Sequence, residues 1–309
     1  MSGDIALMEG ILTMKLSTST NLLFLRPDNS IYPIDQAMKA ICRAGFTELD
    51  MNFYDWATTP GSPYLEADWN AWLELVVETA HLLGVHFPQS HAYFYDFADD
   101  RMDETERSFH EAHVMRSIQC AQAMGVETLV VHPCTAYGAE YSVSASKERN
   151  LQYYDRLLEK TWRYGVTFAI ENMWDLDIAP KRKYCAVPEE LAELVDAFHD
   201  DRIGACWDFE HGDLMQQDQP SIVRQLGARL KATHVSEQHG FSDLSKLHRL
   251  PMSGSIQWEP IMKALREIDY RGCFSYEVNN YLCFLPDSCI EPALRVAYLV
   301  GEHLMNMAG

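Results

Sequence analysis

Short apolar runs rich in β-branched and aromatic residues alternate along the chain with longer segments in which apolar residues recur at helical spacing. The predicted strands are Ile11–Leu16, Phe46–Phe53, Val85–Ala92, Thr128–His132, Thr167–Met173, Ile203–Phe209, Leu230–Val235 and Cys273–Val278. The predicted helices are Ile34–Arg43, Trp69–Leu83, Glu104–Ala123, Arg149–Tyr164, Glu189–Phe198, Ser221–Leu226, Trp258–Ile268 and Pro292–Leu304. Strands that alternate with helices in this way pair in parallel through helical crossovers.

The simplest closed arrangement of these units is a (β/α)8 TIM barrel, and we predict a single α/β domain over residues 1–309. Glycine follows several predicted helices just before the next strand, where the chain needs a left-handed residue to leave the helix. These glycines are Gly45, Gly84, Gly125, Gly165 and Gly272. The structural alternative is an open, doubly wound sheet. Its usual dinucleotide signal, GxGxxG after the first strand, is missing from the sequence.

The composition is that of a globular protein, because 47% of the 309 residues are hydrophobic and 23% are charged. A chain of this length buries a large core without disulfides, and its eight cysteines contain no CxxC pair. The first residues lack a basic start followed by a long apolar run, and no stretch approaches the roughly 18 apolar residues of a membrane span. We therefore expect free thiols, a cytoplasmic location and no membrane association.

The net charge argues against a nucleic-acid partner. Lys and Arg together number 25, whereas Asp and Glu number 45, which gives a balance of −20. Binding to a phosphate backbone draws most of its affinity from cationic side chains. The longest basic run is Lys181–Lys183, so the acidic surface would repel nucleic acid unless a local basic groove intervened.

Chemically competent side chains gather at one end of the predicted strands. Active sites of TIM barrels lie at the C-terminal ends of the strands. The residues at these ends are Ser90 and His91, His132, Glu171 and Asn172, Asp208 to His211, His234 and Glu237, and Glu277. A polar residue at the end of one strand does not indicate a site, because strand ends are commonly exposed to solvent. Six consecutive strands that each deliver a His, Asp or Glu predict a shared site around the barrel axis.

Four of these residues suit a divalent metal, namely Glu171, Asp208, His234 and Glu277. Three carboxylates and one imidazole form a mostly hard oxygen donor set, which favours manganese, magnesium or cobalt over a closed structural zinc. Without a cation the carboxylates would repel one another, and some would have to stay protonated. The alternative is that each residue caps a loop or pairs with a local arginine. We predict one divalent ion, with manganese ahead of magnesium, cobalt and zinc.

The order of several motifs resembles the xylose-isomerase-like superfamily of sugar isomerases and epimerases, which also contains apurinic endonucleases of the endonuclease IV type. The motifs are Ala169–Asn172, Asp208–His211, Lys231–Val235, the late run Leu247–Trp258 and Phe274–Glu277. Their order and spacing are more specific than any single motif. The resemblance implies a TIM barrel in which the four predicted ligands hold one divalent metal in sugar-processing members.

The resemblance also implies catalytic roles. In related ketose epimerases the first and last metal-binding glutamates act as acid and base on opposite faces of the substrate, and the matching pair here is Glu171 and Glu277. They would move a proton next to a sugar carbonyl while the metal stabilises the enediolate. His211 would hold a substrate oxygen beside the metal. His234 is expected to be a ligand and not a base, because a metal-bound imidazole does not readily carry protons.

Further substrate contacts are predicted at His91, His132, His248, Arg249 and Trp174. The Trp174 ring is a candidate wall for a sugar, although aromatic residues at barrel rims also pack lids. Arg249 is either a contact for an anionic substrate or a solvated surface charge. The ketose epimerases carry a substrate-binding arginine shortly after the strand-seven histidine, and residues 236–240 contain none. This departure argues against a keto-hexose 3-epimerase.

Three other functions stay open. A dehydratase of inositol-derived ketones uses similar parts, and a non-catalytic sugar-binding protein would share the pocket. Endonuclease relatives hold three zinc ions on extra histidines, whose places His91, His132, His211 and His248 partly match, but Lys246 stands where an aspartate is required. We expect a small sugar or sugar-derived substrate. Barrels of this family often pair, so a homo-oligomer is also an expectation.

Overall fold

Eight strands close into a barrel in the computed structural model, which describes residues 14–137, 142–175, 183–240 and 244–307. The strands are β1 Lys15–Ser19, β2 Glu48–Asn52, β3 His86–His91, β4 Thr128–Val131, β5 Thr167–Glu171, β6 Ile203–Asp208, β7 Leu230–Val235 and β8 Cys273–Tyr276. Each strand pairs in parallel with the next, and β1 closes the barrel by pairing with β8, where Leu16 lies opposite Phe274. The predicted TIM barrel is confirmed.

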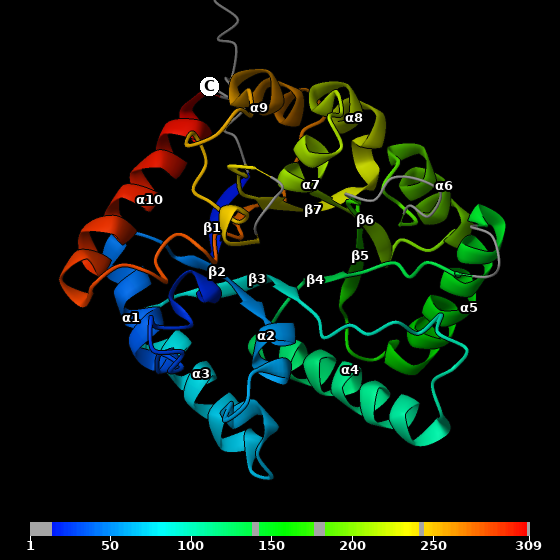
Figure 1. The fold of residues 1–309 in the computed structure, drawn as a ribbon, viewed down its shortest axis with the longest axis horizontal. Helices are drawn as coiled ribbons and strands as arrows, with labels where there is room; N and C mark the ends of the chain where they lie inside the picture. Colours follow the sequence, from blue (N-terminus) through cyan, green and yellow to red (C-terminus); the bar gives the residue numbers. More distant parts are fainter. Residues whose placement is uncertain (1–13, 138–141, 176–182, 241–243, 308–309) are drawn as a thin grey trace, which may run out of the picture.

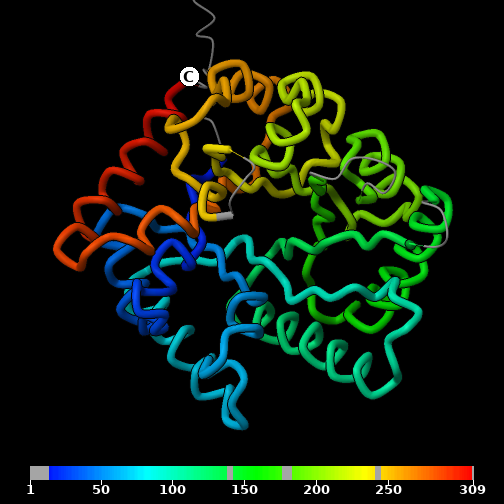
Figure 2. The backbone as a smooth tube through the Cα atoms, in the orientation of Figure 1, coloured from blue at the N-terminus to red at the C-terminus, as the bar shows by residue number. Residues whose placement is uncertain are grey.

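Helices surround the strands (Figure 1). They are α1 Ile34–Ala44, α2 Phe53–Thr58, α3 Trp69–Leu83, α4 Glu104–Met124, α5 Val143–Thr161, α6 Pro188–Phe198, α7 Phe209–Leu214, α8 Gln219–Leu226, α9 Trp258–Glu267 and α10 Asp287–Met307. The backbone trace in Figure 2 follows the outer ring in chain order, from blue α1 to red α10. The two short helices α2 and α7 follow β2 and β6 directly, so they lie at the C-terminal ends of the strands.

Alternation along the strands separates two apolar regions. Large side chains such as Phe168, Trp207 and Phe274 are fully buried in the main core. A separate cluster consists of the smaller residues Val130, Ala169, Cys206 and Ala232. Side chains two positions apart on a strand point to the same face. The residues two positions after the last three members of this small cluster are Glu171, Asp208 and His234. The small interior residues therefore lie beneath a polar layer.

Three elements, β1, α5 and α10, begin four or more residues away from their predicted starts. β1 begins at Lys15 and not at Ile11, and residues 11–13 lie outside the described part of the chain. Its second half, residues 17–19, is polar but buried, so an apolar pattern could not reveal it. α5 begins at Val143, six residues before the predicted start, because the Ser142 side chain caps it by accepting from Ala145 N at 3.1 Å.

The last helix also begins earlier than predicted. α10 starts at Asp287, and Pro292, which was expected at its first position, lies inside the helix. Pro292 is the sixth residue of α10 and has no N–H to donate to the Ser288 carbonyl oxygen, so one bond of the helix is missing there.

None of the described helices combines the length and apolar character needed to cross a membrane. All eight cysteines lie in the described part of the chain, and all are free thiols. Cys134, Cys206 and Cys273 are buried.

Candidate metal centre and substrate cavity

Strands β5 to β8 bring the four predicted metal ligands together at the C-terminal end of the barrel. Glu171 ends β5, Asp208 ends β6, His234 lies near the end of β7, and Glu277 follows β8. One ligand atom from each residue lies within 4.8 Å of those of the other three. His234 Nδ1 is 2.9 Å from Glu171 Oε1 and 3.4 Å from Glu277 Oε2. Residues from four separate strands thus form one cluster.

Burial creates a charge conflict in this cluster. Burial, together with the charges of Glu171 and Glu277, raises the pKa of Asp208 to about 8. The Asp208 Oδ2 atom is buried without a hydrogen-bond partner among the described residues. Burial acts to lower the pKa of His234, but Glu171 and Glu277 raise it well above its usual range. Protons on Asp208 and His234 therefore offset the remaining carboxylates. A divalent cation would replace both protons, so the donor set fits a metal.

Neighbouring groups orient these ligands. Asp208 Oδ1 accepts a hydrogen bond from His211 N at 2.8 Å, so the same carboxylate ends β6 and caps α7. This bond leaves Oδ2 for a cation. On the other side of the cluster, His234 Nε2 lies 3.9 Å from Asp50 Oδ2, while Nδ1 faces the glutamates. A carboxylate behind a ligating histidine fixes the orientation of its ring.

His211 lies beside the cluster in a state that suits hydrogen bonding. Its Nδ1 donates to the Asn172 carbonyl oxygen at 2.8 Å, and its Nε2 lies 3.8 Å from Asp208 Oδ2. Burial lowers the pKa of His211, so the ring is neutral and Nε2 is unprotonated. Such a nitrogen accepts a hydrogen bond from a hydroxyl group.

A second group able to hold a metal shares Glu171. One ligand atom each of His91, His132 and Glu171 lies within 4.8 Å of the other two. Glu171 Oε2 is 3.0 Å from His132 Nε2 and 3.5 Å from His91 Nε2, whereas Oε1 faces His234. Burial lowers the pKa of His132 to about 4, so its ring is neutral. Cys206 is also within ligand distance of Glu171 and His234, but burial raises its thiol pKa well above the usual range, which disfavours a thiolate ligand.

The cluster opens into a cavity of about 300 Å³, at the lower end of the range for small-molecule sites. The predicted site residues that line it are His91, His132, Glu171, Trp174, His211, His248 and Glu277. Phe94 stacks on His132 with ring centroids 3.9 Å apart and on Tyr54 with centroids 4.1 Å apart. Phe94 is stacked between these two rings, and the three side chains line the cavity as an aromatic part of its wall.

His248 and Arg249 differ in position although they are neighbours in sequence. His248 lines the cavity, and its Nδ1 donates to the Glu277 carbonyl oxygen at 3.1 Å. Burial acts to lower its pKa, but Glu210 and Glu277 raise the pKa of His248 to about 9. Arg249 is absent from the described cavity lining, and its guanidinium donates to the Asn280 carbonyl oxygen. The guanidinium group of Arg249 therefore binds backbone outside the described cavity lining.

Sequence reasoning missed several cavity-lining residues, which are Asn52, Asp55, Met173, Lys183 and Asn279. Asn52 Oδ1 accepts from Asp55 N at 3.2 Å and caps α2, and Asn52 Nδ2 lies 3.4 Å from Glu277 Oε1. The Asn-x-x-Asp spacing at the end of the predicted strand Phe46–Phe53 was the available signal, because it is typical of a helix cap. Glu210 was also unassigned, and its Oε2 accepts from His248 N at 2.6 Å.

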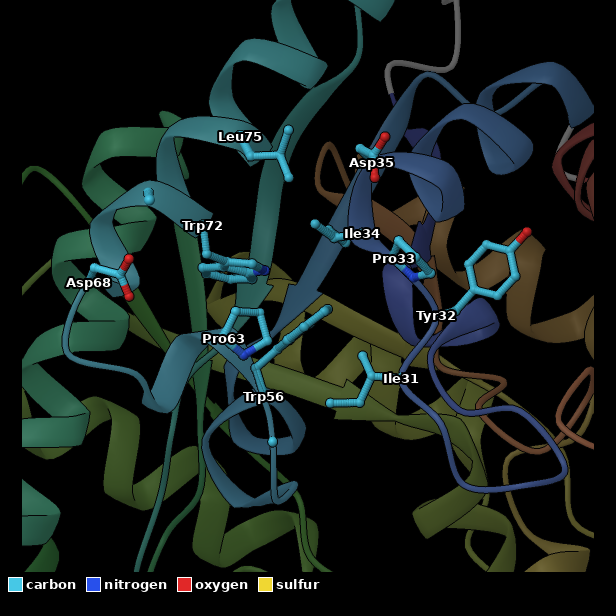
Figure 3. A pocket seen from close by; sticks show the side chains of 12 residues that line it. Ile31, Tyr32, Pro33, Ile34, Asp35, Trp56, Pro63, Asp68, Trp72 and Leu75 are labelled. Atoms are coloured by element: carbon cyan, nitrogen blue, oxygen red, sulfur yellow. The ribbon is translucent and has the colours of Figure 1, made fainter.

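A larger cavity of about 440 Å³ lies outside this site (Figure 3). It is lined by the start of α1, by Trp56 of α2, and by Trp72 and Leu75 of α3. Figure 3 shows the two indole rings among the side chains that surround it. The lining includes none of the predicted site residues. The larger of these two cavities is therefore not the one that contains the predicted site residues.

The sequence matches known proteins over most of its length. The family model described as xylose isomerase-like TIM barrel matches residues 38–297. The uncharacterized protein y4fM of Sinorhizobium fredii is 25% identical over 268 residues, which cover 79% of this chain and 80% of that protein. The uncharacterized protein MJ1311 of Methanocaldococcus jannaschii is 24% identical over 194 residues, covering 62% of this chain and 64% of its own.

Solved structures share the fold at lower sequence identity. A D-tagatose 3-epimerase-like protein has a TM-score of 0.72 and 20% identity, covering 96% of this chain and 98% of its own. A D-psicose 3-epimerase has a TM-score of 0.71 and 12% identity, covering 96% and 100%. The 3-keto-D-glucoside 4-epimerase of E. coli has a TM-score of 0.69 and 14% identity, covering 94% and 99%. At these identities the likeness establishes a common fold.

Proposed function

This chain belongs to the xylose isomerase-like TIM barrel family, and from that premise we propose that it is a divalent-metal-dependent sugar isomerase or epimerase. The observation that carries the proposal is the convergence of three carboxylates and one imidazole within 4.8 Å at the C-terminal end of the barrel. The epimerases of similar fold support this reaction class.

The ion would be held by Glu171, Asp208, His234 and Glu277. A mostly oxygen donor set favours manganese first, with magnesium, cobalt and zinc as alternatives. When bound, such an ion supplies a Lewis acid for the carbonyl and neighbouring hydroxyl oxygens of a sugar.

Glu171 and Glu277 would move the proton. Both line the cavity. Burial acts to raise their pKa values, but the charge of His234 lowers both, so both carboxylates are ionised at neutral pH. One takes the proton from the carbon next to the sugar carbonyl, and the other, after it has taken up a proton from solvent, returns that proton to the opposite face or to the adjacent carbon. The first route gives an epimer and the second gives an isomer.

The remaining lining residues would bind and orient the sugar. The unprotonated Nε2 of His211 accepts a hydrogen bond from a hydroxyl group beside the cluster. Phe94 and Trp174 cover apolar faces of the substrate and exclude water. His91, His132 and His248 contribute polar contacts around the same cavity.

Solvent deuterium exchange tests the proposal. The Mn²⁺-loaded protein is incubated in D₂O with a panel of ketoses and inososes, and deuterium should appear at a carbon next to the carbonyl. Glu171→Gln and Glu277→Gln should each slow exchange by about 100-fold or more, because each removes a general acid–base group. Glu127→Gln is the matched control, since Glu127 is exposed and precedes β4 at the other end of the barrel. Absence of exchange for every substrate contradicts the proposal.

Other outcomes of the same assay identify other functions. Net loss of water from an inosose would indicate a dehydratase. Tight sugar binding without exchange would indicate a non-catalytic binding protein. Cleavage of abasic DNA that survives purification would indicate an endonuclease, in which His91 and His132 would hold a further metal with Glu171.

A further inference from the structure

Lys183 places a cation in the wall of the substrate cavity. It lies between β5 and α6 and lines the cavity together with Glu171 and Glu277. Its backbone N–H donates to Asp175 Oδ2 at 2.8 Å, and its Nζ lies 4.9 Å from the centroid of the Trp174 ring. The backbone bond holds residue 183 beside Asp175, and the ammonium group lies over the Trp174 ring.

The ammonium group has no direct counter-charge among the described residues. Lys183 is the only lysine or arginine in the described cavity lining, and no described carboxylate forms an ion pair with its Nζ within 4.0 Å. Burial lowers the pKa of Lys183, and the charge of Asp175 acts against this effect. An ammonium carries three N–H donors, and an aromatic face satisfies its charge without using them as ordinary hydrogen bonds. These donors are available to a ligand.

A cation at this place favours a charged substrate. The chain carries a net charge of −20, and the carboxyl groups of Asp55, Glu171 and Glu277 line the same cavity. His248, with a pKa of about 9, is a second cationic side chain in the described lining, so an anionic part of a ligand is favoured near His248 or Lys183. An ammonium group can donate to a neutral hydroxyl group, but an anionic group gains an ion pair in addition to the hydrogen bond. Arg249, the cation that the sequence offered for an anion, donates to a backbone carbonyl instead.

We propose that the substrate is an anionic sugar derivative, either a sugar acid or a sugar phosphate, and that Lys183 binds its carboxylate or phosphate group. This inference rests on the proposed function for the position of the reacting carbonyl, which lies at Glu171 and Glu277. Lys183 determines specificity at another part of the substrate and takes no part in proton transfer.

The experiment compares three ketoses that differ only at the terminal carbon, namely D-fructose, D-fructuronate and D-fructose 6-phosphate. Calorimetry measures the Kd of each sugar for the protein with and without Mn²⁺, at low and high NaCl. One or both anions should bind at least about tenfold more tightly than D-fructose, and salt should weaken that preference. The carboxylate and phosphate arms identify which anion is recognised.

Variants assign the preference to its residue. Lys183→Met keeps the apolar stem and should abolish both the preference and its salt dependence while D-fructose affinity is retained. Lys183→Arg should restore most of the preference. Lys147→Met is the control, because Lys147 lies on α5 outside this cavity and pairs with Glu193.

Equal affinity for the three sugars overturns the inference, and so does a failure of both anions to bind. An equal loss of D-fructose and anion affinity in Lys183→Met also overturns it, because that result indicates packing against Trp174. The two proposals fail separately. Lys183-dependent anion binding without deuterium exchange contradicts only the proposed function. Deuterium exchange into neutral sugars without any preference for anions contradicts only the inference about Lys183.

Discussion

Asp208→Asn should stabilise the metal-free protein and remove its response to metal. Asp208 is fully buried, and burial together with Glu171 and Glu277 raises its pKa to about 8. Asparagine keeps the Oδ1 acceptor for the His211 N–H and removes the ionisable group. The substitution therefore acts in opposite directions with and without the ion, which separates a metal ligand from a structural carboxylate.

The size of the effect follows from proton linkage. An aspartate in an unfolded chain titrates near a pKa of about 3.9, so between about pH 4 and pH 8 the folded state binds more protons at Asp208 than the unfolded state. The free energy of unfolding therefore falls as pH rises through this window. At ~1.36 kcal/mol per pH unit, the cost reaches roughly 4 kcal/mol at pH 7. Asparagine avoids this cost, and even half of it corresponds to several degrees in Tm.

Two unfolding series measure the prediction. In metal-stripped protein, the difference in Tm between the variant and the wild type should widen from pH 5 to pH 8. In the presence of Mn²⁺ at about 100 times Kd, the wild type should gain about 2.7 kcal/mol, and the variant should gain almost nothing. Asp96→Asn is the control, because burial also raises the pKa of Asp96 but the residue lies outside the cavity lining. Its Mn²⁺ response should match that of the wild type.

The stability result and the metal-binding result can each contradict the prediction. A metal-free Asp208→Asn protein that is less stable than the wild type at pH 7.5 would refute the charge conflict. A variant that keeps the full Mn²⁺ shift would remove Asp208 from the metal site.

Three further predictions concern the metal, the wall and the barrel. Because His234 is held protonated without metal, Mn²⁺ binding should release protons and tighten from pH 6 to pH 8, as calorimetry in buffers of different ionisation enthalpy will show. Phe94→Ala should weaken sugar affinity about 2- to 10-fold, whereas Trp162→Ala, at a residue 63% exposed, should not. Gly204→Ala should destabilise the fold by about 1–3 kcal/mol in urea unfolding, because its Cβ would lie 2.2 Å from Lys231 Cγ. Unchanged stability of the alanine variant would mean that this part of β6 can shift.

The convergence of the proposed ligands was predictable because strand geometry converts sequence position into spatial position. Side chains alternate along a strand, and the C-terminal ends of parallel strands meet at one end of a barrel. Glu171 and Asp208 each end a strand, so residues far apart in sequence had to converge. No detailed knowledge of the loops was needed for this step.

The cavity wall was less predictable because loops have no such period. Asp55 belongs to α2, whose six residues are too few for helical spacing to show, and its direction depends on the Asn52 cap. Lys183 lies between β5 and α6, outside any helix or strand, and its Nζ lies 4.9 Å from the centroid of the Trp174 ring. β1 was shifted for a different reason, since Ser17 and Ser19 are polar side chains buried in the strand. An apolar pattern carries no signal for any of these residues.

The two oxygens of Glu171 explain how one carboxylate can serve both as a ligand and in proton transfer under the proposed function. Oε1 lies 2.9 Å from His234 Nδ1, within the metal cluster. Oε2 lies 3.0 Å from His132 Nε2 and 3.5 Å from His91 Nε2, and both histidines line the cavity. An oxygen that binds a cation is a poor proton acceptor, so the proton must pass through the other oxygen. The pKa of His132 is about 4, so this ring does not capture the proton, and Oε2 has no hydrogen-bond partner among the described residues.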